Sequence, residues 1–217
     1  MAKQIFEGIK VCDLAWVAAG TQPSRELALH GATVVRVESH RRPDTLRLTG
    51  PFKDFKRGIN RSAFGCAFNT QKFGISVDYS QPKGQEVIKR LIMWADIVTD
   101  SMTPGSLARW GLDYKSVVKF KPDIIYYSTC QMGQHGPLNK FGGYGAYGAA
   151  YSGYCQILGY PDRTPLPLFN NYTDFIAPWY LTIALIAALL YRRKTGKGVY
   201  LDQSQVEAGV TLLTPLM

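Results

Sequence analysis

The sequence predicts an α/β protein: a Rossmann-like parallel sheet with flanking helices, followed by a long buried helix. Short β-branched segments alternate with helix-forming segments up to residue 130, and a long uncharged segment begins near residue 175. Strand–helix–strand units of this length connect parallel strands, so we expect a sheet covered by helices. We divide the 217 residues into an α/β core (1–130), Gly- and Tyr-rich loops (131–173), and a region with a long helix, a turn and a final helix (174–217).

The first elements are short and sharply bounded. Residues 9–14 and 33–38 are apolar or β-branched and predict strands. Between them, residues 16–20 predict a turn, and 23–30 a short helix that begins at Pro23 and ends before Gly31. These segments form the first strand–helix–strand unit.

The second half of the core repeats the alternation. Residues 82–95 predict an amphipathic helix, because apolar side chains recur at steps of three and four. A strand is expected at 97–99 and another at 124–130. Between them, Thr103 and Pro104 predict the start of a short helix that Gly111 ends, and Asp113 caps a helix extending to residue 119.

Beyond residue 130 the composition changes. Gly133 to Gly159 is rich in Gly and Tyr, which favours loops. Gly143, Gly145 and Gly148 match G-x-G-x-x-G, but no strand precedes them, so we interpret the segment as a glycine-rich loop. We expect a helix at 175–194, a turn at 195–198, a strand at 199–202 and an amphipathic helix beginning at Ser204.

One segment has the composition of a membrane span. Residues 176–191 carry no charge and precede Arg192, Arg193 and Lys194. The run is shorter than the roughly 20 residues that cross a bilayer, so we interpret it as a core helix and expect no membrane partner. The first residues lack the apolar run of a signal peptide, which predicts a cytoplasmic location.

Charge and cysteine content limit the function classes. The formal net charge of +9 suits a phosphate-bearing ligand, nucleic acid or an anionic membrane. The four cysteines stand far apart, without a C-x-x-C pair or a nearby His at ligand spacing, so we expect neither a disulfide framework nor a metal site. The hydrolase motifs G-x-S-x-G and H-E-x-x-H are absent, and the three histidines are scattered.

Candidate anion-binding cations follow the predicted strands. Arg41 and Arg42 come just after the strand at 33–38, where ligands of open α/β sheets bind. Lys72 and Arg109 lie near other strand–helix junctions. Each of these side chains is equally well explained as a solvated surface charge.

Asp174 lies where the loop region meets the long helix. A carboxylate at this position caps a helix through backbone N–H groups, and the residue pattern alone favours that interpretation. A helix N-terminus and partial burial also suit a nucleophilic aspartate that forms covalent intermediates. Both interpretations stay open on the residues alone.

Many of these segments together resemble the class III CoA-transferases, which include formyl-CoA, carnitine and benzylsuccinate CoA-transferases, with α-methylacyl-CoA racemases as relatives. The resemblance spans essentially the whole chain and corresponds to the family's amino-terminal half, so it implies that the carboxy-terminal half of the family fold is absent. The matching positions are 8–14, 29–38, Asp44, Arg47, 68–69, Lys72, 75–78, 82–84, 95–98, 104–105, 109–112, Pro122, 133–137, Asp174, 187–192 and 194–198.

The resemblance implies a CoA-transferase in which Asp174 attacks an acyl-CoA and then carries CoA as an aspartyl thioester. Acyl-CoA and a small carboxylic acid would be substrates, with no permanently bound cofactor. It also implies a homodimer or heteromer, because subunits of full-length relatives interlock. The implied CoA contacts are Val17, Ala18, Arg41, Arg42, Asn69, Lys72, Pro104 and Arg109, and the implied substrate-pocket residues are Trp16, Gln134 and Tyr144.

The sequence departs from the family at three places. Trp16, Val17 and Ala18 stand where a polar His or Gln is frequent, and Ser39 stands where an Arg often follows the strand, so Arg41 or Arg42 would have to substitute. Tyr144 stands where the racemase relatives carry a His base. A racemase needs a second acid–base group, so this difference favours transfer.

Three alternatives remain beside the CoA-transferase. The first is an acyl-CoA racemase or isomerase on the same scaffold. The second is a non-catalytic CoA-binding partner of an active homologue. The third is a nucleic-acid binder, which the charge permits but no recognised motif supports, so we expect no nucleic-acid partner.

Overall fold

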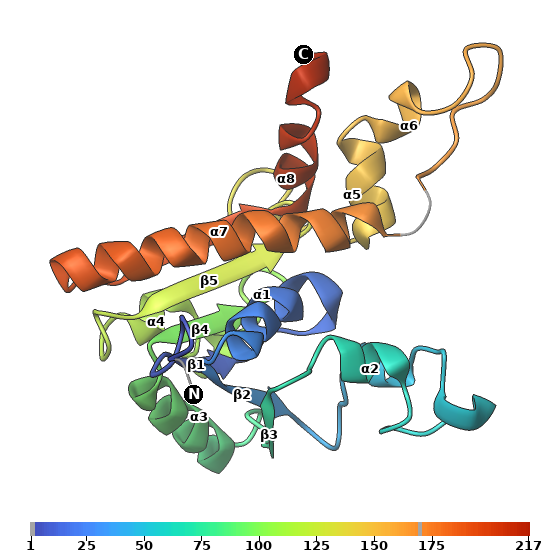
Figure 1. The fold of residues 1–217 in the computed structure, drawn as a ribbon. Coiled ribbons are helices and arrows are strands. Elements are labelled where there is room, and N and C mark those ends of the chain that lie inside the picture. Colours follow the sequence, from blue (N-terminus) through green and yellow to red (C-terminus); the bar gives the residue numbers. More distant parts are fainter. Residues whose placement is uncertain (1–2, 169–170) are drawn as a thin grey trace.

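The computed structural model describes residues 3–168 and 171–217 and contains a six-stranded sheet (Figure 1). All neighbouring strands are parallel, in the order β3-β2-β1-β4-β5-β6. This confirms the predicted α/β class with a Rossmann-like sheet. The strands are β1 (Lys10–Asp13), β2 (Thr33–Glu38), β3 (Phe73–Ser76), β4 (Ile97–Asp100), β5 (Ile125–Cys130) and β6 (Val199–Ser204).

Helices cover both faces of the sheet (Figure 1). The α-helices are α1 (Val17–Leu29), α2 (Ala63–Ala67), α3 (Pro82–Trp94), α4 (Tyr114–Val117), α5 (Gly145–Tyr151), α6 (Tyr154–Ile157), α7 (Tyr172–Thr195) and α8 (Gln205–Thr211). Short 3-10 helices occur at Thr45–Leu48, Lys53–Phe55, Ala108–Trp110 and Thr214–Leu216.

The pleat of the strands divides the core into two layers. Alternate side chains of a strand point to opposite faces, so Val11 and Cys12 on β1 enter different apolar clusters. One cluster packs β1, β4 and β5 against α1 and α7 through Leu27, Leu181 and Leu185. The other packs the opposite face against α3 and α4.

The first helix begins earlier than the sequence predicts. The turn expected at 16–20 is the first part of α1, and Pro23, which we expected to open the helix, lies inside it. Residues 18–24 are buried in the fold. The stabilisation from this burial exceeds the cost of the backbone hydrogen bond that is missing at Pro23. The hydroxyl of Thr21 also donates to the carbonyl oxygen of Val17 at 2.6 Å.

Two core segments differ from the prediction. The helix expected from Thr103 is instead a turn followed by the 3-10 helix Ala108–Trp110, because Gly105 adopts a positive φ of 78° that interrupts an α-helix. Strand β3 was not predicted. It is a short edge strand with mostly exposed side chains, so it lacks the apolar alternation that identifies a strand.

The segment 131–173 contains more regular structure than the predicted loops. Helices α5 and α6 form within it, and Gly145, from the G-x-G-x-x-G match, begins α5. A Cβ at Gly145 would lie 2.5 Å from the carbonyl oxygen of Asn171, so glycine permits close packing against the start of α7. Positions 169 and 170 of this segment lie outside the described residues.

The predicted long helix is confirmed as α7, and it is longer than the uncharged run. One face is buried through Ile176, Leu181 and Leu185, whereas Trp179 and Ile183 are exposed. With 24 residues, α7 is long and apolar enough to cross a membrane by length and composition, so our argument from a short run does not hold. The packing of its buried face on the sheet places α7 in the core of this domain.

The end of the chain differs in detail from the prediction. Strand β6 continues to Ser204, two residues beyond the predicted strand, and helix α8 ends at Thr211. The hydroxyl of Ser204 accepts a hydrogen bond from the backbone N–H of Glu207 at 3.2 Å and so caps α8. This end of the chain lies beside α5 (Figure 1).

Candidate active site

The sheet brings the carboxyl ends of β1, β4 and β5 to one edge. The chain leaves β1 toward β2 on one side and leaves the adjacent β4 toward β5 on the other, and such a switch point between β1 and β4 forms a ligand-binding crevice in open α/β sheets. A cavity of about 400 Å³ lies there. Its lining residues are Trp16, Val17, Ala19, Gly20, Arg42, Pro43, Thr45, Ser101, Met102, Thr103, Pro104, Thr129, Cys130, Gln131, Asn139, Phe141, Gly142, Gly143, Tyr144, Asp174 and Gln205.

Asp174 lines this cavity from the first turn of α7, and the residue is only 5% exposed. The backbone N–H of Gly145 donates a hydrogen bond to its Oδ2 at 3.3 Å. A second hydrogen bond joins the carboxylate to the side chain of Gln205. The carboxylate is therefore held in place while it still faces the cavity.

Burial raises the pKa of the Asp174 carboxyl to about 6, although the hydrogen bonds from Gly145 and Gln205 limit the rise. A carboxyl with this pKa is mostly ionised at neutral pH. It is also more basic than an ordinary aspartate, because burial destabilises its charged form. These properties suit a carboxylate nucleophile.

The turn between β1 and α1 forms the opposite wall of the cavity. The hydroxyl of Ser101 joins this turn to the end of β4, accepting from the backbone N–H of Trp16 at 2.7 Å. Val17 adopts a φ of 60°, a strained conformation for a β-branched residue, and its N–H donates to Asp44 at 3.1 Å. The start of helix α1 is thereby fixed at the cavity.

Asp174 and Arg42 are the charged residues among those lining the cavity in the described part of the chain. The Arg42 guanidinium lies 5.3 Å from the centre of the Trp16 ring, and among the described residues it forms no ion pair. An exposed, unpaired guanidinium at a cavity is suited to bind a phosphate or carboxylate.

Comparison with known proteins agrees with this arrangement. Residues 6–217 match the sequence profile of CoA-transferase family III. The chain belongs to this family. The match covers all six strands of the sheet, the Gly-rich segment and helix α7.

Relatives in the family include CoA-transferases that use succinyl-CoA. The chain is 34% identical over 213 residues to succinate–glutarate CoA-transferase of Agrobacterium fabrum, covering 97% of this chain and 53% of that protein. It is 33% identical over 209 residues to succinyl-CoA:glutarate CoA-transferase of Homo sapiens, covering 96% and 47%. The chain thus spans about half the length of the curated relatives that it matches.

A solved family structure has the same fold. The crystal structure of a CAIB/BAIF family protein from Brucella suis superposes with a TM-score of 0.90 at 31% identity. The match covers 99% of this chain and 56% of that protein. This chain therefore shares its fold with that protein.

The structure brings together six of the residues that the sequence pointed to. They come from four separate parts of the chain: the turn after β1, the segment after β2, the segment after β4, and the α5–α7 region. The six residues lining the Asp174 cavity are Trp16, Val17, Arg42, Pro104, Tyr144 and Asp174 itself.

Lys72 does not line this cavity, and its proposed contact with CoA stays a prediction. Its side chain is buried, and its ammonium donates to Oδ2 of Asp13 and to the carbonyl oxygen of Thr21, both at 2.8 Å. Arg36 lies 3.6 Å from the same Asp13 carboxylate and pairs also with Asp44. Lys72 is thus part of a buried ion-pair network beneath α1, and its charge is already paired.

Four other predicted CoA contacts also lie away from the cavity lining. Ala18 is buried against Leu46, and the Asn69 amide donates to the carbonyl oxygen of Gly65 at 2.9 Å. Arg41 pairs with Asp78 at 3.6 Å, and the exposed Arg109 lies over the Trp110 ring. Their proposed contacts with CoA stay predictions.

Gln134 lines a second cavity of about 450 Å³, next to the first, and Thr103 and Pro104 line both. Burial raises the pKa of Asp100 in this second cavity to about 7. His135 accompanies Gln134 there and lies 2.8 Å from Asp202. The predicted pocket residues thus occupy two adjacent cavities.

Sequence reasoning missed two glutamines of the site. Gln131 directly follows β5 and Gln205 begins α8, and both side chains are buried at the Asp174 cavity. The position of Gln131 after a buried strand was a usable signal, because the carboxyl ends of parallel strands meet at one edge. Gln205 had no such signal, because its place depends on how α8 packs against α7.

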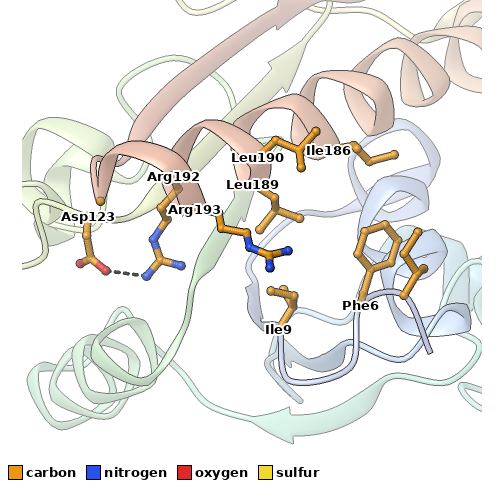
Figure 2. Close-up of a pocket in the computed structure, with 10 residues that line it drawn as sticks. Phe6, Ile9, Asp123, Ile186, Leu189, Leu190, Arg192 and Arg193 are labelled. Atoms are coloured by element: carbon orange, nitrogen blue, oxygen red, sulfur yellow. Dashed lines mark hydrogen bonds and ion pairs between the residues drawn. The ribbon is translucent and has the colours of Figure 1, made fainter. Parts of the chain in front are cut away.

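A further cavity of about 550 Å³ lies at the opposite edge of the sheet, between the N-terminal segment and the end of α7 (Figure 2). Apolar side chains such as Phe6, Ile186 and Leu190 line it, and Arg192 and Asp123 close one end with an ion pair. Its described lining contains none of the candidate catalytic, CoA-contact or substrate-pocket residues. We therefore place the candidate active site at Asp174.

Proposed function

We propose that this chain carries the nucleophile of an acyl-CoA:carboxylate CoA-transferase, which moves CoA from a thioester to a free carboxylic acid. The observation that carries the proposal is the buried Asp174 carboxylate, held by Gly145 at one wall of the cavity and with a raised pKa. The names of the succinyl-CoA-dependent relatives support the same reaction.

The first half-reaction needs only this carboxylate and CoA itself. An oxygen of Asp174 attacks the thioester carbonyl carbon, and the carbon–sulfur bond breaks. CoA leaves as a thiolate, and the acyl group stays on Asp174 as a mixed anhydride. The thiolate then attacks the carboxyl carbon of Asp174. The donor acid leaves as a carboxylate, and an aspartyl-CoA thioester remains.

The second half-reaction reverses these steps with the acceptor acid. The acceptor carboxylate attacks the aspartyl thioester and releases the thiolate, which attacks the acyl carbon of the new anhydride and frees Asp174. No net proton transfer is required, which fits a cavity whose described lining contains no histidine.

The surroundings of Asp174 support this chemistry. The N–H of Gly145 and the N-terminus of α7 stabilise negative charge on the carboxylate and on the oxygens that form when it reacts. Arg42 supplies a positive charge for the CoA phosphates, and the rings of Trp16 and Phe141 exclude water. The start of α1 adds backbone N–H groups for an anion.

Racemisation is less well supported. Moving a proton at the α-carbon requires an acid and a base on opposite sides of that carbon. Among the described residues that line the cavity, Asp174 is the carboxylate, and the nearest counterpart to a racemase base is the exposed Tyr144. Transfer therefore accounts better for the residues present.

An isotope exchange distinguishes the two reactions. The protein is incubated with unlabelled succinyl-CoA and ¹³C-succinate in deuterated water, and the recovered thioester is analysed by mass spectrometry. Transfer predicts ¹³C in succinyl-CoA without deuterium at the α-carbon. Deuterium uptake without ¹³C would instead identify a racemase or isomerase.

We also propose that the protein acts as a homodimer or heteromer. The exposed face of α7 presents Trp179, Ile183 and Leu190 to solvent, and such an apolar surface is typical of protein–protein contacts. Sedimentation of the purified protein tests the homodimer, since a mass equal to one chain at all concentrations would contradict it.

A further inference from the structure

Gln131 is a buried amide at the Asp174 cavity with no assigned role. It directly follows β5, lines the cavity and is 4% exposed. Among the described residues, neither its Nε2 nor its Oε1 has a hydrogen-bond partner. A buried amide without a partner is unfavourable, so a fold that retains one at a cavity is suited to a ligand that pairs with it.

The position of Gln131 is fixed by its neighbours. Its carbonyl oxygen accepts hydrogen bonds from the N–H of Val206 and the hydroxyl of Ser204, both at 3.2 Å. Its side chain passes beside α5, where a Cβ added at Gly148 would lie 2.6 Å from Nε2. The amide has little room to turn away from the cavity.

The same packing joins Gln131 to the nucleophile. A Cβ at Gly148 would also lie 2.2 Å from the hydroxyl oxygen of Thr173, so the Gln131 amide and the Thr173 hydroxyl both lie close to Gly148. Thr173 directly precedes Asp174 and donates to the carbonyl oxygen of Gly145 at 3.0 Å. Gln131, whose amide is unpaired, therefore lines the same cavity as Asp174 and packs against the residue that precedes it.

An unpaired amide discriminates between acyl chains. A chain with an additional oxygen group can pair with the amide, whereas an alkyl chain of the same length leaves the amide buried and unsatisfied. Sites built to form hydrogen bonds strongly reject analogues that lack the partner group. The remaining lining, with Trp16, Met102 and Phe141, offers the carbon chain an apolar surface.

We propose that Gln131 makes the acyl site select acids that carry a second oxygen group, either carboxylate or hydroxyl, over plain alkyl acids. The inference rests on the proposed function, because it requires a CoA thioester at Asp174. It adds the chemical class of the acyl group and the residue that recognises it.

Binding to a non-reacting protein tests the inference. In the Asp174→Asn background, calorimetry measures the affinity for three four-carbon thioesters: succinyl-CoA, 3-hydroxybutyryl-CoA and butyryl-CoA. With Gln131 intact, at least one oxygen-bearing thioester is expected to bind about tenfold or more tightly than butyryl-CoA. The comparison of succinyl-CoA with 3-hydroxybutyryl-CoA identifies which oxygen group is preferred.

A second substitution isolates Gln131. Gln131→Met keeps the length of the side chain and removes its hydrogen bonds, so the preference should fall to within about threefold while butyryl-CoA binds at least as tightly. Gln156→Met is the matched control, because Gln156 is exposed on α6, and it should leave the preference unchanged.

Each outcome has a defined meaning. Equal affinity for all three thioesters with Gln131 intact, or a preference that survives Gln131→Met, overturns the inference and leaves the transferase proposal standing. A folded protein that binds none of the thioesters overturns both. A preference that disappears only in Gln131→Met establishes Gln131 as the selecting residue.

Discussion

The backbone nitrogen of Gly145 lies 3.3 Å from Oδ2 of Asp174, and a Cβ at Gly145 would lie 2.7 Å from the backbone nitrogen of that same aspartate. The Gly-rich segment and the start of α7 are thus in direct contact, and the contact both supports the carboxylate and requires glycine. Gly145 therefore serves packing at the nucleophile.

Gly145→Ala is expected to separate α5 from α7. The added methyl group overlaps backbone atoms that cannot turn aside, so the free energy of unfolding should fall by about 1–3 kcal/mol. CoA transfer should fall about 10-fold or more, because the displaced backbone N–H of residue 145 no longer reaches Asp174. Urea denaturation and a transfer assay measure the two effects.

Gly142→Ala is the control for that experiment, because no heavy atom lies within 4 Å of its added Cβ. Equal stability of Gly145→Ala and Gly142→Ala would contradict the described packing.

Lys72→Met separates a structural role from a ligand-binding one. The substitution removes the ammonium that pairs with Asp13, so the buried carboxylate keeps a negative charge that is only partly balanced. The free energy of unfolding should therefore fall by about 3–5 kcal/mol. The exposed Lys83→Met should change stability little. If Lys72→Met kept its stability and lost only CoA affinity, its role would be in binding, as the sequence first indicated.

Arg42 and its neighbour Arg41 form a matched pair of cations. Arg42 lines the cavity without an ion pair among the described residues, whereas Arg41 pairs with Asp78 away from it. Arg42→Gln should weaken CoA binding about tenfold and reduce its dependence on salt. Arg41→Gln should have a much smaller effect. Calorimetric titration at two salt concentrations measures both, and equal losses would contradict the assignment.

The raised pKa of Asp174 gives stability a defined pH dependence. The folded protein binds this proton more tightly than the unfolded chain, so the residue's contribution to stability is present below pH 4 and is lost as pH rises through about 6. The difference in free energy of unfolding between Asp174→Asn and wild type should therefore shift in favour of the variant by up to about 3 kcal/mol from pH 4 to pH 7. Thermal unfolding at both pH values measures this difference, and no gain at pH 7 would contradict the burial of a charged Asp174.

The sheet was largely predictable from sequence because β1, β2, β4 and β5 are buried, β-branched and separated by helix signals. Edge strand β3 was missed because its exposed side chains carry no apolar alternation. The start of α1 was misplaced because tertiary burial, and not a capping side chain, determines where that helix begins.

The site was predictable to the extent that it depends on chain position. Arg42 was indicated by its place after a strand, whereas the resemblance to the family implied the role of Asp174 and the choice of Trp16 and Val17. Sequence position does not reveal that the ammonium of Lys72 is paired with Asp13 and Thr21. Gln205 depends on the packing of α8, which local sequence does not specify.

The central claim is that Asp174 forms a covalent bond with CoA, and mass spectrometry of the intact protein tests it most directly. Wild type and Asp174→Asn are incubated with succinyl-CoA, and circular dichroism verifies that both are folded. The account predicts a CoA or acyl adduct on the wild type that peptide mapping assigns to Asp174 and that the variant lacks. An adduct of equal yield on Asp174→Asn, or CoA transfer by that variant at the wild-type rate, would contradict it.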